Sequence, residues 1–228
     1  RKIKYNVGGT GLIAAHVALL DPRLTLGLPG RITAGTGMDA LTHAIECYTC
    51  AYAQPWPDAV ALWAIETIGQ WLRVAYAQGA NEEARYQMAM ASMLAGMSYG
   101  TESAGAVHAM SQTAGGVYDL PHGELTASLL APVMAFNYLG EPHKYARIAQ
   151  AMGENTWGMS VWDAAELAVE AVARLSYDIG IPTLPEMGIP EADIPMLAQL
   201  AFDDPQTIGN PRDIDVKGYE QIYRSCID

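Results

Sequence analysis

The feature that most constrains the fold is helical periodicity, which runs from Thr33 to the C-terminus. Segments rich in Ala, Leu and Met alternate with Gly, Pro and Asn, the residues that end one helix and start another. Half of the 228 residues are apolar, which is enough to build a buried core. The pattern predicts a mainly α, multi-helical fold, with helices at residues 36–53, 57–78, 81–103, 105–116, 122–139, 142–152, 160–178, 191–203 and 213–227.

The first 22 residues have a different texture. They contain alternating, β-compatible stretches, are interrupted by Gly8-Gly9, and end in Asp21-Pro22, which predicts one or two short strands. The chain also begins with Arg1 rather than Met. We therefore expect a short N-terminal β segment in a chain that is a fragment, an engineered piece or a processed protein.

Charge and composition exclude several classes of partner. The formal net charge is −12, and the clustered Lys and Arg that bind nucleic acid or anionic membranes are missing. The apolar run ASLLAPVMAF is too short to span a bilayer and contains a proline. Three cysteines form a sparse, odd set, which is typical of a reducing compartment. We expect a cytoplasmic protein that acts on a small molecule and binds neither nucleic acid nor membrane.

Two further patterns invite a functional interpretation. The spacing of Cys47 and Cys50 permits thiol or zinc chemistry, but both continue an apolar helix and no second CxxC exists, so ordinary packing is the stronger hypothesis. The segment MAMASMLAGMS at 88–98 permits a methionine-lined cofactor site. Core filling between closely packed helices is again the simpler prediction.

Four side chains could bind a metal together. Asp39 and His43 are four residues apart on one helix and therefore share a face; His108 and His122 follow in the segments AVHAM and LPHGE. A single histidine on an apolar helix is more often structural, so the set carries the argument. One carboxylate and three imidazoles suit Fe(II), Zn(II), Co(II), Ni(II) or Mn(II). Because four protein ligands saturate tetrahedral zinc, an open position for substrate favours iron.

Such a centre predicts a class of reactions. A metal with an open position polarises an alcohol or carbonyl oxygen, and a transferred hydride needs an acceptor, normally a nicotinamide. The chain has no GxGxxG or P-loop motif to hold one. Gln112 follows His108 by four residues and either points toward the same cavity or lies on the helix surface. Metal-assisted hydrolysis is a weaker alternative because no general base stands out.

With these motifs identified, the chain resembles the C-terminal, metal-binding domain of the iron-containing (group III) alcohol dehydrogenase family. The similarity runs across nearly the whole chain, and GMDALTHAIE followed by VHAM and LPHG is highly specific. The matching stretches are DPRLTLGLPGRITAGTGMDALTHAIECY (21–48), EARYQMAMASMLAGMSYGTESAGAVHAM (83–110), YDLPHGELTASLLAPVMAFN (118–137) and GNPRD (209–213).

The resemblance implies a domain organisation and a fold. Residues 1–25 would be the remaining strand or strands of an N-terminal α/β dinucleotide-binding domain that lies outside this chain. Residues 26–228 would form an all-helical, metal-binding catalytic domain of the dehydroquinate-synthase-like type. The main NAD or NADP contacts would belong to the other domain, and the expected assembly is a homo-oligomer such as a dimer.

The resemblance also implies the roles of the site residues. The family's metal ligands match Asp39, His43, His108 and His122, and all four are intact. Many members carry a second histidine near the nicotinamide where this chain has Gln112, which would instead position substrate or nicotinamide.

These points lead to two hypotheses about function. The first is the metal-binding domain of an NAD(P)-dependent, iron-type alcohol dehydrogenase that interconverts alcohols and aldehydes or ketones by hydride transfer. In that case the isolated fragment is expected to be weakly active or inactive. The second is a truncated, catalytically inactive helical domain that binds metal or another protein.

Overall fold

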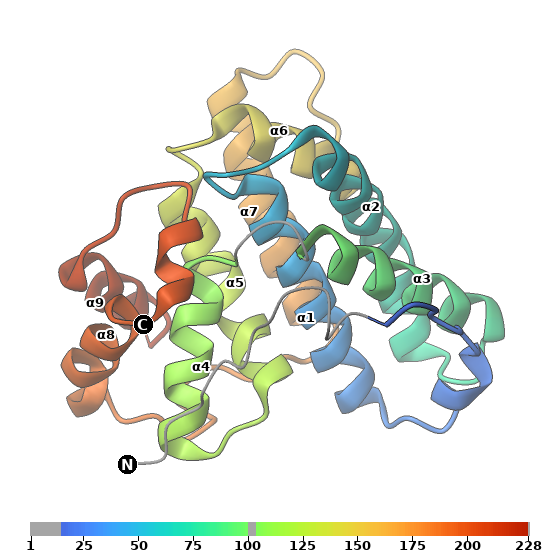
Figure 1. Ribbon diagram of the computed structural model, residues 1–228, viewed down its shortest axis with the longest axis horizontal. Coiled ribbons are helices and arrows are strands. Elements are labelled where there is room, and N and C mark those ends of the chain that lie inside the picture. The colour runs from blue at the N-terminus through green and yellow to red at the C-terminus, as the bar shows by residue number, and fades with distance from the viewer. Residues whose placement is uncertain (1–14, 100–103, 228) are drawn as a thin grey trace.

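The computed structural model describes residues 15–99 and 104–227, and this part of the chain is helical (Figure 1). The mainly α prediction is confirmed, and each predicted helix has a counterpart. The α-helices are α1 (Gly30–Thr49), α2 (Pro55–Ala77), α3 (Glu82–Tyr99), α4 (Ala106–Tyr118), α5 (His122–Asn137), α6 (Pro142–Ala151), α7 (Val161–Asp178), α8 (Ile194–Phe202) and α9 (Val216–Ser225), with short 3-10 helices η1 (Pro22–Thr25), η2 (Glu191–Asp193) and η3 (Pro205–Gly209).

Helix α1 is the centre of the fold. It packs against α2, α3, α5 and α6, and most of its residues are buried, from Thr33 to Thr49. Figure 1 shows α1 between α2 and α3 on one side and α4 and α5 on the other. A helix enclosed in this way can present side chains to several neighbours at once, and this is how the candidate site is assembled.

The start of α1 differs from the prediction. The sequence pattern placed it at residue 36, whereas the helix begins at Gly30. Its first turns contain Gly and β-branched residues, which have low helix propensity. Tertiary contacts compensate, because the Arg85 guanidinium donates a hydrogen bond to Thr33 Oγ1 at 2.7 Å and Arg31 pairs with Glu124 of α5.

The remaining helices pack around this centre. Helices α6 and α7 pack on each other, α4 packs on both α5 and α8, and α8 packs on α9. Their ends follow ordinary capping rules. Asn81 Oδ1 accepts from the Ala84 amide at 3.1 Å at the start of α3, and Ser160 caps α7. Gly153 and Gly180, which follow the ends of α6 and α7, adopt positive φ.

The predicted N-terminal β segment does not appear in the described residues. Residues 15–21 form no strand, and Pro22–Thr25 is a 3-10 helix. A strand needs a partner to take its backbone hydrogen bonds, and within the described residues none lies alongside. The residues predicted as the first strand, including Ile3 and Val7, lie outside the described part, and the boundary between 1–25 and 26–228 stays a prediction.

The cysteine and methionine patterns can now be compared with the structure. Cys47 and Cys50 are buried and no disulfide joins them, as expected for packing. The methionines behave differently, because Met88 is only partly buried and Met97 is 43% exposed. Met88 still packs against the core and Ala91 and Ala95 are fully buried, as the core-filling prediction requires, whereas Met97 lies at the surface.

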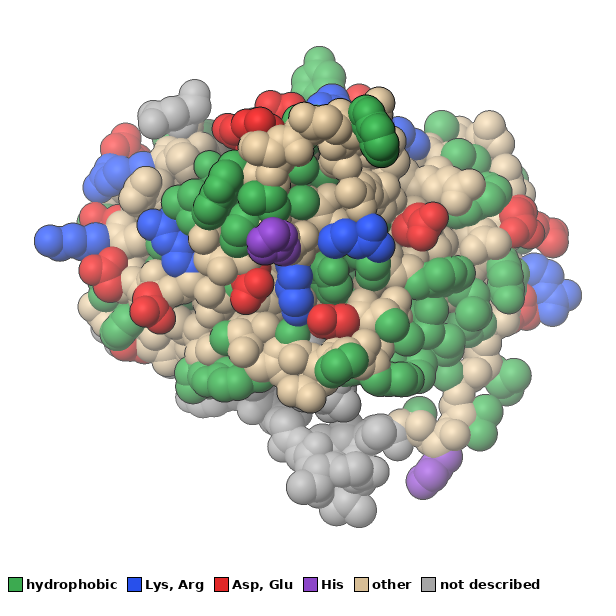
Figure 2. All heavy atoms as spheres, turned by 90° about the horizontal axis from the view of Figure 1, so that it is seen from above, with side chains coloured by type: hydrophobic (Ala, Val, Ile, Leu, Met, Phe, Trp, Pro, Cys, Tyr) green, Lys and Arg blue, Asp and Glu red, His purple; other side chains and the backbone are tan. Residues whose placement is uncertain are grey.

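One face of the molecule carries side chains of both charges and many apolar ones. Figure 2 shows acidic and basic side chains interspersed among apolar ones on the face seen from above. A partly buried lysine links three helices. The Lys144 ammonium of α6 donates to the Tyr48 carbonyl of α1 at 2.5 Å and to Asp58 of α2 at 2.9 Å. Among the helices described, none is long and apolar enough to cross a membrane.

Candidate metal centre

The four predicted ligands converge at one place. Asp39 and His43 project from the same face of α1, His108 from the first turn of α4, and His122 is the first residue of α5. Potential ligand atoms of Asp39, His43 and His108 all lie within 4.8 Å of one another. His122 Nε2 lies 3.4 Å from Asp39 Oδ1. The structure thus brings together residues from three helices, of which the first, Asp39, and the last, His122, are 83 positions apart in the sequence.

The site has a closed side and an open side. The His108 ring is in contact with both other imidazoles, with ring centroids 4.4 Å from His43 and 5.5 Å from His122. Its side chain is 3% exposed, whereas those of Asp39 and His122 are 24% and 32% exposed. A ligand can therefore approach from the side of Asp39 and His122 but not past His108.

His43 is held in one orientation. Its Nδ1 lies 2.9 Å from the Asp39 backbone carbonyl, one turn earlier on α1; since a carbonyl only accepts, Nδ1 carries the proton. Burial, together with the neighbouring His108, lowers the pKa of His43. The neutral ring with an unprotonated Nε2 is the form that binds a metal. The Tyr99 and His43 rings form a T-shaped pair, with centroids 5.3 Å apart.

Asp39 and His108 have polar partners that the sequence did not reveal. Thr126 Oγ1 donates to Asp39 Oδ1 at 3.0 Å. The Glu46 carboxylate, 6% exposed, lies 2.5 Å from His108 Nδ1. Burial lowers the pKa of His108, but the carboxylates of Glu46, Asp39 and Asp204 together outweigh this and the net pKa is raised. In the sequence, the only indication of a role for Glu46 is that it is a single acidic residue in the otherwise apolar run AIECY.

The close approach of the α5 and α1 backbones sets the position of His122. Gly123 lies so near α1 that a Cβ atom there would sit 2.6 Å from the Gly35 carbonyl oxygen. The absence of a side chain lets the start of α5 rest directly on the α1 backbone. The ion pair of Arg31 with the buried Glu124 fastens the same junction. His122 therefore reaches Asp39 because of this contact.

The donor set fits a divalent transition metal. His108 Nε2 is buried and has no hydrogen-bond partner, which is costly for a polar atom unless something else binds it. Three imidazoles and one carboxylate are ligands that Fe(II), Zn(II), Co(II), Ni(II) and Mn(II) accept. The residues present therefore fit a metal, although the donors do not select among these ions.

The structure gives the position of Gln112 on α4. It lies one turn after His108 on α4 and is half-buried. Its proposed contact with substrate or nicotinamide stays a prediction.

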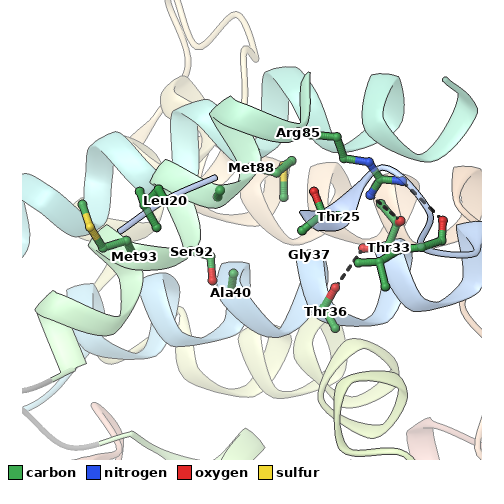
Figure 3. A pocket seen from close by; sticks show the side chains of 12 residues that line it. Leu20, Thr25, Thr33, Thr36, Gly37, Ala40, Arg85, Met88, Ser92 and Met93 are labelled. Carbon is green, nitrogen blue, oxygen red and sulfur yellow. Dashed lines mark hydrogen bonds between the residues drawn. The ribbon is translucent and has the colours of Figure 1, made fainter. Parts of the chain in front are cut away.

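A cavity of about 370 Å³ lies between α1, α3 and the segment before α1, and none of the four candidate ligands lines it. Figure 3 shows Arg85 and Thr33 at one end and Ala40, Ser92 and Met93 toward the other. Thr33, Thr36, Gly37 and Ala40 line the cavity from α1, and by helix geometry they are centred on a different face from Asp39 and His43. The lining is mostly apolar, which accounts for the half-exposed methionines of α3.

The chain is similar to several known proteins. The family model described as "Fe-containing alcohol dehydrogenase family, C-terminal" matches residues 33–227. The chain is 50% identical to choline dehydrogenase of Bacillus subtilis (strain 168) over 228 residues, which is all of this chain and 56% of that protein. It is also 50% identical to 1,3-propanediol dehydrogenase of Citrobacter freundii, over 92% of this chain and 54% of that protein.

A solved structure shows the same fold. The crystal structure of a 1,3-propanediol oxidoreductase superposes with a TM-score of 0.88 at 46% identity, covering 90% of this chain and 54% of that one. The chain thus spans about half the length of the relatives it matches. On these matches the chain belongs to the iron-containing alcohol dehydrogenase family, of which it represents the C-terminal domain.

Proposed function

We propose that this chain is the metal-binding, catalytic part of an NAD(P)-dependent alcohol dehydrogenase that interconverts small alcohols with aldehydes or ketones. Fe(II) is the proposed ion, held by Asp39, His43, His108 and His122. The observation that carries the proposal is the convergence of these four donors, which includes the buried, unpartnered Nε2 of His108.

A divalent ion bound there would polarise the oxygen of an alcohol or carbonyl substrate. The protein side chains set the conditions for this chemistry. The hydrogen bond from His43 to the Asp39 carbonyl keeps Nε2 available as a donor atom. Burial of His108 closes the inner side to water. The partial exposure of Asp39 and His122 leaves the outer side as the entry for substrate.

The hydride acceptor is proposed to be NAD or NADP. The glycine-rich motifs that cradle a dinucleotide are absent from the sequence, and the chain spans about half the length of its relatives. We therefore place the main dinucleotide contacts on residues beyond this chain. Gln112, half-buried one turn after His108, is proposed to contact the nicotinamide or the substrate. Cytoplasmic location and a homo-oligomer stay predictions from the sequence.

The relatives' names support a small alcohol as substrate. One is a choline dehydrogenase and another a 1,3-propanediol dehydrogenase, and both named substrates carry a primary alcohol on a short chain. We propose the same class for this protein without choosing among its members.

The test replaces one ligand. The 228-residue chain and its His122→Ala variant are loaded with Fe(II) without oxygen, and bound iron is measured after desalting. His143→Ala is the matched control, because His143 is exposed on α6. Wild type and control are expected to retain about one iron per chain, and His122→Ala much less, since it lacks one of four ligands. Equal iron retention in all three proteins would contradict the proposed centre.

Activity provides the second measurement. Production of reduced nicotinamide is followed with NAD or NADP and short primary alcohols. Any turnover by the wild-type chain should disappear in His122→Ala and persist in His143→Ala. Turnover that survives His122→Ala would contradict the catalytic role of the centre. Lack of turnover by the wild-type chain does not separate a dehydrogenase from an inactive metal-binding domain, because the main dinucleotide contacts are proposed to lie beyond this chain; turnover that requires His122 supports the dehydrogenase.

A further inference from the structure

Glu46 stands out among the residues around the candidate centre. It lies on α1 one turn after His43, and its side chain is 6% exposed. Both carboxylate oxygens are engaged by α4: Oε1 accepts from the Val107 amide at 2.7 Å, and Oε2 lies 2.5 Å from His108 Nδ1. A buried carboxylate needs partners of this kind, because leaving it unpaired in the interior is costly.

The start of α4 is built to accept this carboxylate. The helix is preceded by Gly105, which offers no side chain as a cap. Asn210 Oδ1 lies 3.3 Å from the Ala106 amide, and Glu46 takes the next amide. A Cβ atom at Gly105 would lie 3.0 Å from Glu46 Oε1. Glycine therefore provides the space in which a residue from α1 caps α4.

The contact with His108 has a direct consequence for that ring. A carboxylate accepts hydrogen bonds and cannot donate one when ionised. The short contact therefore requires a proton on Nδ1 and directs the opposite ring nitrogen, Nε2, into the centre. That nitrogen is the buried atom without a hydrogen-bond partner. In known metal sites, carboxylates that hold the second nitrogen of a ligating histidine fix its tautomer and its orientation.

We infer that Glu46 is a positioning residue for the metal centre: it holds Nδ1 of His108 so that Nε2 faces the other three donors. This inference rests on the proposed function, since it assigns a role toward the same ion. Glu46 also adds a second negative charge to that of Asp39. Two carboxylates offset the charge of a divalent ion in a site that is largely shielded from water.

A purely structural role is the competing explanation, and one substitution separates the two. Glu46→Gln keeps the size of the side chain, and its amide oxygen can still accept from the Val107 amide. Its NH2 group then faces His108 Nδ1, which must become the acceptor and move its proton to Nε2. If the amide is reversed, the NH2 group meets the Val107 amide and the cap is lost. In neither orientation can the glutamine keep both the cap on Val107 and the proton on His108 Nδ1.

Co(II) is the probe, because its visible absorption reports the ligand geometry. Affinity is measured by competition with a chelator in the wild-type chain, in Glu46→Gln and in Asn210→Ala. The glutamine variant should bind Co(II) about 10- to 100-fold more weakly and with an altered spectrum. Asn210→Ala, which removes a neighbouring cap but leaves His108 untouched, should melt at a lower temperature with Co(II) affinity close to wild type. Wild-type affinity and spectrum in Glu46→Gln would overturn the inference.

A second measurement covers the case in which Glu46→Gln does not fold. Nitrogen NMR of the metal-free wild-type chain should show His108 with a protonated Nδ1, and an unprotonated Nδ1 would overturn the inference. The results also separate this inference from the proposed function. Failure of the wild-type chain to bind Co(II) or Fe(II) would refute the proposed function. Metal binding that is insensitive to Glu46→Gln would refute only the role of Glu46.

Discussion

Gly123→Ala tests whether the packing of α5 on α1 sets the position of a metal ligand. The new Cβ atom would lie 2.6 Å from the Gly35 carbonyl oxygen and 2.8 Å from its carbon. Carbon-to-oxygen contacts are comfortable at about 3.3 Å or more, so the backbones must separate by about 0.7 Å. Both contacting groups are backbone, and no rotamer change can relieve the clash.

This displacement is large on the scale of metal coordination. Bond lengths in metal sites tolerate about 0.2 Å, and His122 immediately precedes Gly123 at the start of α5. Moving α5 away would widen the present separation of 3.4 Å between His122 Nε2 and Asp39 Oδ1. We expect at least a tenfold loss of Co(II) affinity, together with a decrease of about 1 to 3 kcal/mol in the free energy of unfolding from overpacking.

The assay combines chelator competition for affinity with urea denaturation of the metal-free protein. Gly140→Ala is the matched control, because its Cβ would lie 2.7 Å from the Pro211 carbonyl oxygen, a clash of similar severity next to none of the four ligands. Both variants should lose similar stability, but only Gly123→Ala should lose affinity. Unchanged Co(II) binding by Gly123→Ala would refute the claim that this contact positions His122.

Three further substitutions test individual contacts. Thr126→Val removes the hydroxyl that donates to Asp39 and should weaken Co(II) binding several-fold in the same competition assay; unchanged binding would show that the hydroxyl does not orient the carboxylate. Tyr223→Phe removes a buried hydroxyl 3.0 Å from an α4 carbonyl and should lower the free energy of unfolding by about 0.5 to 1.5 kcal/mol, with metal affinity as the unaffected control. Ser160→Ala removes the side-chain cap of α7 and should cost about 1 kcal/mol in urea denaturation; a Ser160→Asp variant that is no more stable than the alanine variant would argue against the cap.

The sequence predicted helices better than it predicted their ends. Caps such as Asn81 and Ser160 act within a few residues, so local pattern reveals them. The early start of α1 depends on Arg85 and Glu124, which lie on other helices. Such tertiary contacts can outweigh the poor helix propensity of glycine and β-branched residues, and no local window contains them.

The candidate site likewise combines features that a local pattern predicts with features that depend on tertiary contacts. The spacing of Asp39 and His43 predicts a shared helix face, and the structure brings His108 and His122 to that face. Spacing alone could not place the last two, which depend on how α4 and α5 pack. Glu46 was missed because its role depends wholly on this packing, although a lone acid in an apolar run was a usable signal.

The position of Glu46 also explains why one helix can organise the whole centre. Asp39, His43 and Glu46 follow the spacing i, i+4, i+7, which forms a single stripe along α1. Helices α4 and α5 both begin at this stripe. Helix N-termini carry partial positive charge and unsatisfied amides, so they favour carboxylates. Glu46 therefore stabilises the start of α4 without an ion, and Asp39 lies beside the first residue of α5. This arrangement keeps His108 and His122 close to Asp39 before a metal binds, and less ordering is then required when it does.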